Sequence, residues 1–312
     1  MTQSRDRKII LVTRKTRLEN LIMRYNTMEQ AKFVIEHSGS DFSDYIKEDA
    51  TYKQVVSSII STLEVFGYVQ VVDREYIPTF IFSKNSIVVA VGQDGLVANV
   101  LKYLDTQPLI GVNPDPLRYD GVLLPFRVKD LTAVMKDLLS GNAGFKEVTL
   151  AKASLNDGQT LLGVNDIFIG QRTHTSAQYI VESGDKKEIQ SSSGIIISTG
   201  LGSTGWLKSI LAGASVIASV CLEASLELRK RKEIRWNSDY LYYTVREPYP
   251  SKWTSAEMVF GEINKGTSFK VQSLMPDNGV IFSDGIENDY LQFNSGSEVV
   301  ITIDDHKGML VV

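Results

Sequence analysis

One short stretch of the sequence, Gly92–Gly95, combines a carboxylate with glycines that let a backbone approach a ligand closely. It reads Gly-Gln-Asp-Gly, follows the apolar run at 86–91 and precedes helix-like spacing at 96–104. A loop between a buried strand and a helix holds phosphate with its amides and with the helix dipole. Asp94 could there remove the proton of an attacking alcohol. The stretch predicts a phosphate cradle beside a general base, and a plain strand-to-helix turn is the alternative.

Two further stretches carry amide and carboxylate groups that suit a ligand. Asn113 lies in a proline-rich loop after the strand-like run at 109–112, at the sheet edge where ligands of open α/β folds bind. Asn165 and Asp166 stand side by side before another apolar run. An amide donates and accepts hydrogen bonds while a carboxylate accepts them, which matches the two hydroxyls of a ribose. The alternative interpretation of Asn113 is a rigid connection that binds no ligand, and the alternative for Asn165 and Asp166 is a plain turn before a strand.

The strongest local signal lies between Ser191 and Trp206, where a strand-like run breaks into a loop of Gly, Ser and Thr before a long helix. Such a loop offers amides and hydroxyls to a nucleotide, and Trp206 offers a stacking face for adenine or nicotinamide. A glycine-rich helix start with a packed tryptophan is the alternative. Further on, Asp284 and Gly285 predict a hairpin turn, with Asp284 as a secondary candidate for binding.

These stretches sit in a pattern of two parts. In the first, apolar periodicity predicts strands at 9–12, 68–72, 86–91 and 109–112 and helices at 18–37, 52–66, 96–104 and 131–139. Such alternation predicts a mostly parallel sheet covered by helices. The pattern changes near 140–144, so we expect domains at 1–142 and 143–312.

The second part is predicted to be β-rich. Its expected strands are at 146–155, 167–170, 177–183, 194–198, 241–245, 268–274 and 298–303. Hairpin turns are expected at 156–158, 183–185 and 277–279. One long helix, at about 206–230, interrupts the strands, and its apolar segment 210–222 is too short for a membrane span, which predicts a core helix and no membrane.

Composition excludes several classes of function. The 33 basic and 37 acidic side chains give a net charge of -4, which argues against broad binding of DNA or RNA. The single cysteine forms no disulfide framework, and the three histidines lack ligand-like spacing, so no protein metal site is expected. A charged start that leads straight into a strand leaves no room for a secretion signal, and we expect a cytoplasmic protein.

Taken in order, these stretches resemble the NAD kinase family over residues 87–303. The stretch 92–95 is similar to the family's Gly-Gly-Asp-Gly loop, and Asn165-Asp166 is similar to its Asn-Glu pair. The segment 199–206 is similar to the family's Thr-x-x-Gly-Ser-Thr-Ala-Tyr, and 283–285 to its late Asp-Gly turn. Within the family, the mitochondrial-type branch is the most similar, as 111–116, 192–194, 245–248 and Trp206 indicate.

The resemblance implies a Rossmann-like α/β N-terminal domain and a β-rich C-terminal domain, with NAD in the crevice between them and ATP with Mg²⁺ as phosphate donor. It implies that Asp94 engages the ribose 2'-hydroxyl as the catalytic residue and that Asn165 and Asp166 hold ribose hydroxyls. The remaining cofactor-binding residues that it implies are Gly92, Gln93, Gly95, Asn113, Ser193, Thr199, Gly202, Ser203, Thr204, Gly205, Trp206 and Asp284. A homodimer or larger homo-oligomer is usual in the family.

An ATP-dependent NAD kinase that makes NADP is therefore the leading hypothesis. Gln93 stands where the family has its second glycine, and a side chain there could crowd the phosphates. A nucleotide-binding protein without transfer activity is accordingly one alternative. A lipid or other alcohol kinase of the wider superfamily is another, although Asn165-Asp166 and the segment 203–206 favour a dinucleotide acceptor.

Overall fold

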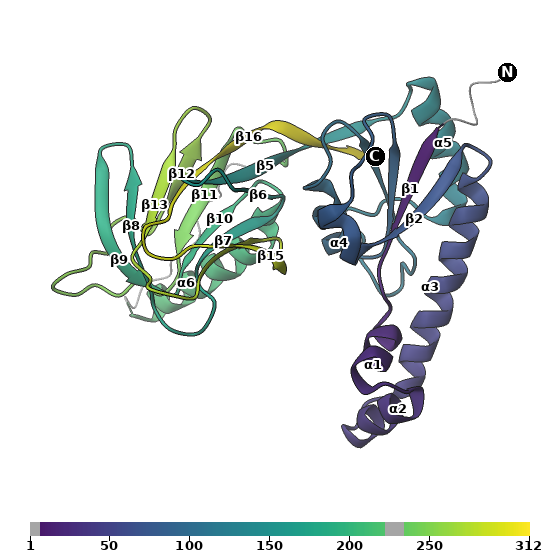
Figure 1. Cartoon of the computed structure of the whole chain (residues 1–312), viewed down its shortest axis with the longest axis horizontal. Helices are drawn as coiled ribbons and strands as arrows, with labels where there is room; N and C mark the ends of the chain where they lie inside the picture. Colours follow the sequence, from purple (N-terminus) through teal and green to yellow (C-terminus); the bar gives the residue numbers. More distant parts are fainter. Residues whose placement is uncertain (1–6, 222–233) are drawn as a thin grey trace. The chain divides into compact units, whose positions relative to one another are not determined.

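The computed structural model describes residues 7–221 and 234–312, without the side chains of residues 287 and 288 (Figure 1). The chain forms two compact units. The first comprises Met1–Lys146 together with Met309–Val312, and the second comprises Glu147–Gly308.

A parallel sheet with strand order β2-β1-β3-β4 forms the centre of the first unit. The strands are β1 (Lys8–Thr13), β2 (Tyr68–Asp73), β3 (Ile87–Val91) and β4 (Pro108–Val112), so the four strands expected here are confirmed. All of β3 is buried, because a parallel strand covered on both faces needs apolar side chains on both. The end of β16 (Glu298–Val311) extends this sheet, since Met309 and Leu310 pair in parallel with β4.

The first three helices of the first unit begin at side-chain caps, which are Thr16, Thr27 and Asp41. The helices are α1 (Arg17–Tyr25), α2 (Met28–His37), α3 (Phe42–Leu63), α4 (Asp94–Leu101) and α5 (Leu131–Ser140), with short 3-10 turns η1 (Arg74–Thr79) and η2 (Val128–Asp130). The single helix expected at 18–37 is wrong: Asn26 has a left-handed φ of 66°, and Thr27 caps a new helix. The helix α3 begins well before the expected residue 52, because Asp41 caps it. Apolar residues of α3 and α5 pack with β1, β3 and β4 into one core.

Two sheets enclose the core of the second unit. The first is antiparallel with order β12-β11-β10-β7-β14-β15, and in the second β16-β13-β8-β9 are neighbours while β5 pairs with β16 and β6. The strands are β5 (Phe145–Leu155), β6 (Thr160–Gly163), β7 (Asp166–Gln171), β8 (Ala177–Ser183), β9 (Lys186–Ser192), β10 (Ile195–Ser198), β11 (Tyr240–Val245), β12 (Phe260–Asn264), β13 (Phe269–Ser273), β14 (Gly279–Ser283) and β15 (Ile286–Gln292).

Two of the expected hairpin turns join paired strands, and one does not. The turns at 156–158 and 183–185 connect β5 to β6 and β8 to β9. The turn at 277–279 contains Asn278 with φ of 55°, but it joins β13 to β14, which belong to different sheets. The hairpin prediction is wrong at this place, because a turn residue specifies a local bend and not which strand pairs afterwards.

The helix α6 (Trp206–Cys221) is not the core helix that its composition predicts. Only Leu207 is buried, because the six-stranded sheet meets Trp206 and Ile210 in the first turns and leaves Val216, Ile217 and Val220 exposed. By length and composition alone, 202–221 could cross a membrane, a test that core helices of soluble proteins also pass. The predicted continuation to residue 230 lies outside the described residues.

Candidate functional site

The expected phosphate loop lies where β3 ends and α4 begins. Gly92 is buried, and a methyl group at its α-carbon would come within 2.9 Å of the Leu96 side chain. Gln93 occupies the N-cap position of α4, where its carbonyl accepts hydrogen bonds from Leu96 and Val97 while its exposed side chain makes no cap bond. No atom lies within 4 Å of the position that a methyl group would occupy on the exposed Gly95. The corner therefore leaves the amides at the start of α4 open to an anion.

Asp94 is the first residue of α4, and main-chain donors orient its half-buried carboxylate. Its Oδ1 accepts a hydrogen bond from the amide of Leu123 at 2.7 Å, and its Oδ2 accepts one from Val122 at 3.3 Å. The loop that donates these bonds packs closely on β4, since a methyl group on Gly111 would lie 2.1 Å from the Leu123 oxygen. The carboxylate is held in one orientation and keeps lone pairs for a further donor.

Asn113 builds the loop after β4 and does not present its amide to the surface. Its Nδ2 donates to the Tyr119 oxygen at 2.9 Å, and its Oδ1 accepts from the Asp115 amide at 3.0 Å. The residue is 7% exposed. The sheet register places it beside Gly92, because β3 and β4 pair up to Val91 and Val112. Asn113 therefore shapes the edge of this corner.

Arg14 follows β1 and connects several elements at the same edge of the sheet. Its Nη2 contacts Glu48 Oε1 at 2.8 Å and donates to the Tyr119 hydroxyl at 2.9 Å. Its Nε is buried without a hydrogen-bond partner. A methyl group on Gly92 would lie 3.5 Å from this Nε, so the guanidinium adjoins the corner. Sequence analysis missed Arg14, although its position just after a buried strand matches that of Gly92 and Asn113.

In the second unit, the carboxylate of Asp284 binds the main chain at Asn165 and Asp166. Its carboxylate accepts hydrogen bonds from the amides of Val164 at 3.0 Å, Asn165 at 2.6 Å and Asp166 at 3.3 Å. Asp284 lies in the β14–β15 hairpin turn with φ of 55°, and Gly285 follows with φ of 69°. The expected hairpin is confirmed, and the side chain of Asp284 positions its neighbours.

Asp166 begins β7 and carries a carboxyl group whose Oδ1 is buried without a hydrogen-bond partner. Burial raises the pKa of Asp166 from 3.8 to about 7, and the negative charge of Asp284 adds to this, while the Ser198 hydroxyl opposes it. The oxygen lies against the loop that follows β10, 2.8 Å from the position of a methyl group on Gly202. A carboxyl group in this state can donate or accept a hydrogen bond near neutral pH.

The loop 199–205 satisfies its own hydroxyl groups. The Thr199 hydroxyl donates to the Val164 oxygen and accepts from the Gly202 amide at 3.2 Å. The hydroxyls of Ser203 and Thr204 donate to the oxygens of Gly200 at 2.7 Å and Leu201 at 3.3 Å. The same loop forms the 3-10 turn η3 (Gly202–Thr204), and Gly205 leads from it into α6 with φ of -100° and ψ of -115°.

The indole of Trp206 packs on the six-stranded sheet and makes a cation–π contact with an arginine. Its indole stacks on Phe168 with ring centres 6.0 Å apart, and the Arg246 guanidinium carbon lies 5.6 Å from the centre of the indole. The exposed Ser193 donates its amide hydrogen to the Arg246 oxygen. Ser193 precedes β10, whereas Thr199 follows it, so the two residues lie at opposite ends of that strand.

The predicted residues thus form three groups. Residues 92–95 and Asn113 meet in the first unit. Asn165, Asp166, Asp284 and the loop 199–204 meet in the second, whereas Ser193 lies at the far end of β10 beside Arg246. In the part of the chain that is described, no group of three His, Cys, Asp or Glu side chains is arranged to hold a metal ion.

Comparison with known proteins finds NAD kinases among the sequence relatives and among the proteins of similar fold. No protein-family model matches the chain. Human mitochondrial NAD kinase 2 is 26% identical over 318 aligned positions, which cover 80% of this chain and 72% of the human protein. The NAD kinase of Chloroherpeton thalassium is 31% identical over 134 positions, 41% of this chain and 46% of that protein. These matches support the NAD kinase family.

Solved structures of NAD kinases share the fold over nearly the whole chain. The NAD kinase of Archaeoglobus fulgidus, in complex with ATP, superposes with a TM-score of 0.58, covering 98% of this chain and 93% of that one at 14% identity. Yeast NADH kinase complexed with NADH gives a TM-score of 0.61, covering 98% and 83% at 14% identity. The NAD kinase fold, with an α/β N-terminal unit and a β-rich second unit, is therefore established for this chain.

Proposed function

We propose that this chain is an ATP-dependent NAD kinase, which phosphorylates the adenosine ribose 2'-hydroxyl of NAD to give NADP. The observation that carries the proposal is the oriented carboxylate of Asp94 at the open amino end of α4. Human NAD kinase 2, similar over 80% of the chain, supports the same activity.

In the proposed reaction the 2'-oxygen of NAD attacks the γ-phosphorus of ATP. The new oxygen–phosphorus bond forms as the bond between the γ-phosphorus and the β,γ-bridging oxygen breaks, and ADP leaves. Asp94 accepts the proton of the 2'-hydroxyl, and the amides at the start of α4 hold the donor phosphates. Asn165 and Asp166 bind ribose hydroxyls of NAD.

We propose that Mg²⁺ arrives with the triphosphate. The side chains that could coordinate the ion support this. Among the described residues, Asp94 lies at the loop, but no three His, Cys, Asp or Glu side chains are grouped to hold a metal ion by themselves. Bound to the phosphates, the ion supplies positive charge that stabilises the developing negative charge on the leaving ADP.

The decisive test incubates the pure protein with NAD, ATP and Mg²⁺ and measures NADP with an NADP-specific dehydrogenase. We expect Asp94→Asn to lower kcat about 100-fold or more, because the proton acceptor is lost while the amide oxygen still accepts from Leu123. Asp115→Asn changes a loop carboxylate of the same unit and serves as the control.

Each possible result of this assay separates the hypotheses. Equal activity of Asp94→Asn and the wild type contradicts the role of Asp94. NAD binding without NADP formation favours the nucleotide-binding protein suggested by Gln93, and transfer to a lipid or another alcohol instead of NAD favours the wider kinase superfamily.

We further propose a homodimer or larger homo-oligomer in a reducing, cytoplasmic compartment. The exposed apolar side chains of Val216, Ile217 and Val220 on α6 support self-association, and the free, exposed Cys221 suits a reducing environment. Sedimentation equilibrium of the wild type and of Ile217→Lys tests the assembly, and a monomeric wild type would contradict it.

A further inference from the structure

The loop that follows β4 leaves the edge of the sheet and returns to it before η2. At its base, the amide of Asn113 donates to the Phe126 oxygen at 2.8 Å. Residues 115–122 lie between these points and are exposed or half-buried. The last of them, Val122, donates its amide hydrogen to Oδ2 of Asp94 at 3.3 Å. The position of the segment 115–122 therefore bears on the orientation of the Asp94 carboxylate.

An ion pair attaches this segment to the first turn of α3. The Nη1 of Arg118 donates to Oδ2 of Asp44 at 3.1 Å, and its Nη2 donates to Oδ1. Two bonds between a guanidinium and a carboxylate fix an orientation as well as a distance. Arg118 and Arg17 beside it hold the pKa of the Asp44 carboxyl well below its usual range, so the carboxylate stays charged at neutral pH. The side chains of Arg118 and Asp44 are 27% and 43% exposed, so the pair contributes little to global stability.

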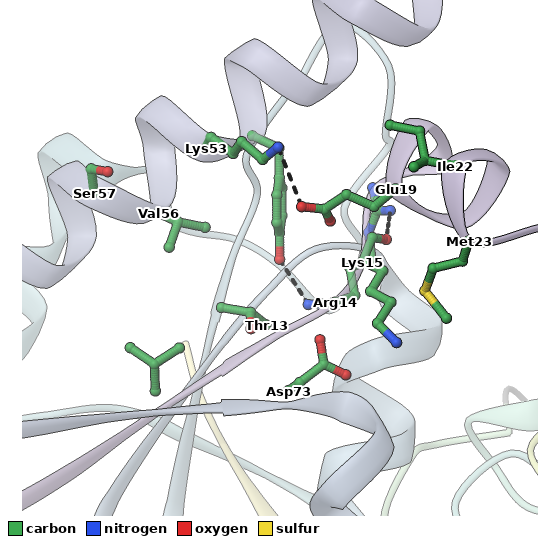
Figure 2. A pocket seen from close by; sticks show the side chains of 12 residues that line it. Thr13, Arg14, Lys15, Glu19, Ile22, Met23, Lys53, Val56, Ser57 and Asp73 are labelled. Atoms are coloured by element: carbon green, nitrogen blue, oxygen red, sulfur yellow. Dashed lines mark hydrogen bonds and ion pairs between the residues drawn. The ribbon is translucent and has the colours of Figure 1, made fainter. Parts of the chain in front are cut away.

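A second contact attaches the same segment to the end of β1. The Tyr119 hydroxyl accepts a hydrogen bond from Nη2 of Arg14 at 2.9 Å. Arg14 is itself fixed, because its guanidinium pairs with Glu48 at 2.8 Å. Figure 2 shows Arg14 at the wall of a cavity of about 630 Å³. Because Arg14 also adjoins Gly92, the contact of Arg118 is the one that can be removed without altering a neighbour of Gly92.

A short connection leads from Arg118 to Val122. Gly121 turns it with φ of 67°, and a methyl group on Gly121 would lie 2.5 Å from Nδ2 of Asn113. Asn113 in turn donates from Nδ2 to the Tyr119 oxygen at 2.9 Å. Such close packing leaves the connection little freedom, so a displaced Arg118 moves the amide of Val122 with it.

Resting on the proposed function, we propose that Arg118 and Asp44 are positioning residues for the carboxylate of Asp94. Their ion pair holds the amide of Val122 where it donates to Oδ2, while packing on β4 holds the amide of Leu123 at Oδ1. Loss of the ion pair frees the carboxylate to rotate about its bond to Leu123. Fewer molecules then hold the carboxylate in the orientation that receives the proton of the 2'-hydroxyl, so transfer slows while substrate binding is retained.

The test removes the ion pair and compares the result with a matched variant. Arg118→Met keeps an apolar stem and loses the charge. Arg17→Met removes the other guanidinium that contacts Asp44, at 2.6 Å, but Arg17 belongs to α1 and not to the loop. Both variants take an ion pair from the same carboxylate, and Arg118→Met alone frees the segment 115–122. Circular dichroism checks the fold of each variant.

Steady-state kinetics with NAD, ATP and Mg²⁺ measures the effect on transfer. We expect Arg118→Met to lower kcat about tenfold and to leave both KM values unchanged, because only an orientation is lost. Arg17→Met should keep the wild-type kcat. In an Asp94→Asn background, Arg118→Met should lower kcat no further, since the carboxylate through which it acts is absent. An equal fall in Arg17→Met, or a fall that persists in the Asp94→Asn background, overturns the proposal.

Hydrogen exchange of the Val122 amide, followed by NMR, measures the positioning without turnover. The bond to Asp94 slows this exchange, so Arg118→Met should accelerate it about tenfold and Arg17→Met should not. Unchanged exchange in Arg118→Met overturns the positioning role. If the wild type makes no NADP, the proposed function is contradicted, and the exchange rates alone then support or overturn the positioning of Asp94.

Discussion

The chain turns from a buried strand into a helix at two glycine-rich corners, β3–α4 and β10–α6, and the two corners use their glycines in opposite ways. At β3–α4, Gly95 has no atom within 4 Å of an added methyl group. At β10–α6, a methyl group on Gly200 would lie 2.0 Å from the Arg235 oxygen, and one on Gly202 would lie 2.0 Å from the Asn165 oxygen. Gly95 leaves room for a ligand at the first corner, whereas Gly200 and Gly202 leave room for the protein's own backbone at the second.

The polar groups of the two corners differ in the same way as the glycines do. At β3–α4 the residues Gln93 and Gly95 are exposed at the start of α4, and Asp94 is oriented by a neighbouring loop. At β10–α6 the hydroxyls of Thr199, Ser203 and Thr204 are bonded to main-chain oxygens. A run of Gly, Ser and Thr in a sequence therefore indicates a tight corner, and only the contacts show whether its polar groups remain for a ligand.

Alanine substitution at the two corners tests this difference most strongly. Gly202→Ala should lower the free energy of unfolding of the second unit by about 3 kcal/mol, because the methyl group meets rigid backbone. Gly95→Ala should leave stability unchanged or raise it by up to about 1 kcal/mol, because alanine favours helix. Urea unfolding followed by tryptophan fluorescence reports the second unit, which holds all three tryptophans, and circular dichroism reports both. Equal losses in the two variants would contradict the comparison.

Removing the charge of Asp284 tests whether this carboxylate stabilises the main chain of the second corner. Asp284→Asn should cost about 2 kcal/mol of unfolding free energy, because three amides lose a charged acceptor. Asparagine tolerates the φ of 55°, so the backbone is retained. Asp157→Asn alters an exposed turn carboxylate that accepts hydrogen bonds from the nearby Gln159, and it should cost less than about 1 kcal/mol. A cost as small for Asp284→Asn would show that the amides find other acceptors.

The second corner should also make the stability of the protein depend on pH, because it contains the buried carboxyl group of Asp166. Because burial raises the pKa of Asp166 from 3.8 to about 7, the protonated form stabilises the folded protein below pH 4, and this contribution is lost as pH rises to about 7. Asp166→Asn removes the titration, so its stability relative to the wild type should increase over the same range. Urea unfolding at several pH values measures this, and parallel profiles would contradict a buried, protonated Asp166.

The smallest effect is expected from a single hydroxyl. Ser203→Ala should lower the unfolding free energy of the second unit by about 1 kcal/mol, because the hydroxyl donates to Gly200. If the hydroxyl instead served NAD, stability would be unchanged and NAD affinity would fall about tenfold, which calorimetric titration would detect.

Much of the first unit follows from local signals. Buried parallel strands are continuous apolar runs, and the predictions at 86–91 and 109–112 followed from such runs. Boundaries set by a cap were not: the break at Asn26 and the early start of α3 at Asp41 depend on polar side chains within stretches of unchanged composition. The strand partners of β13 and β14 depend on contacts between distant residues, which turn chemistry does not specify.

At the candidate site, residue types were easier to predict than their roles. Asp94 and Asp284 both stand beside a glycine at the end of a strand, yet one carboxylate is oriented by two amides and the other is committed to three. Asn113 binds its own loop. Arg14 was missed because a lone basic residue after a strand has no distinctive spacing, and its role follows from packing against Gly92.

The pairing of Met309 and Leu310 with β4 bears on how the protein forms during synthesis. The sheet of the first unit includes a strand that the ribosome makes only after the whole second unit. Until then the start of β4, at Pro108 and Leu109, stays unpaired on this edge, whereas Phe126 already bridges Val112. An open parallel edge is prone to pairing with other chains. A nascent chain halted after residue 146 should therefore aggregate or bind a chaperone, whereas the second unit can complete its core as soon as β16 emerges.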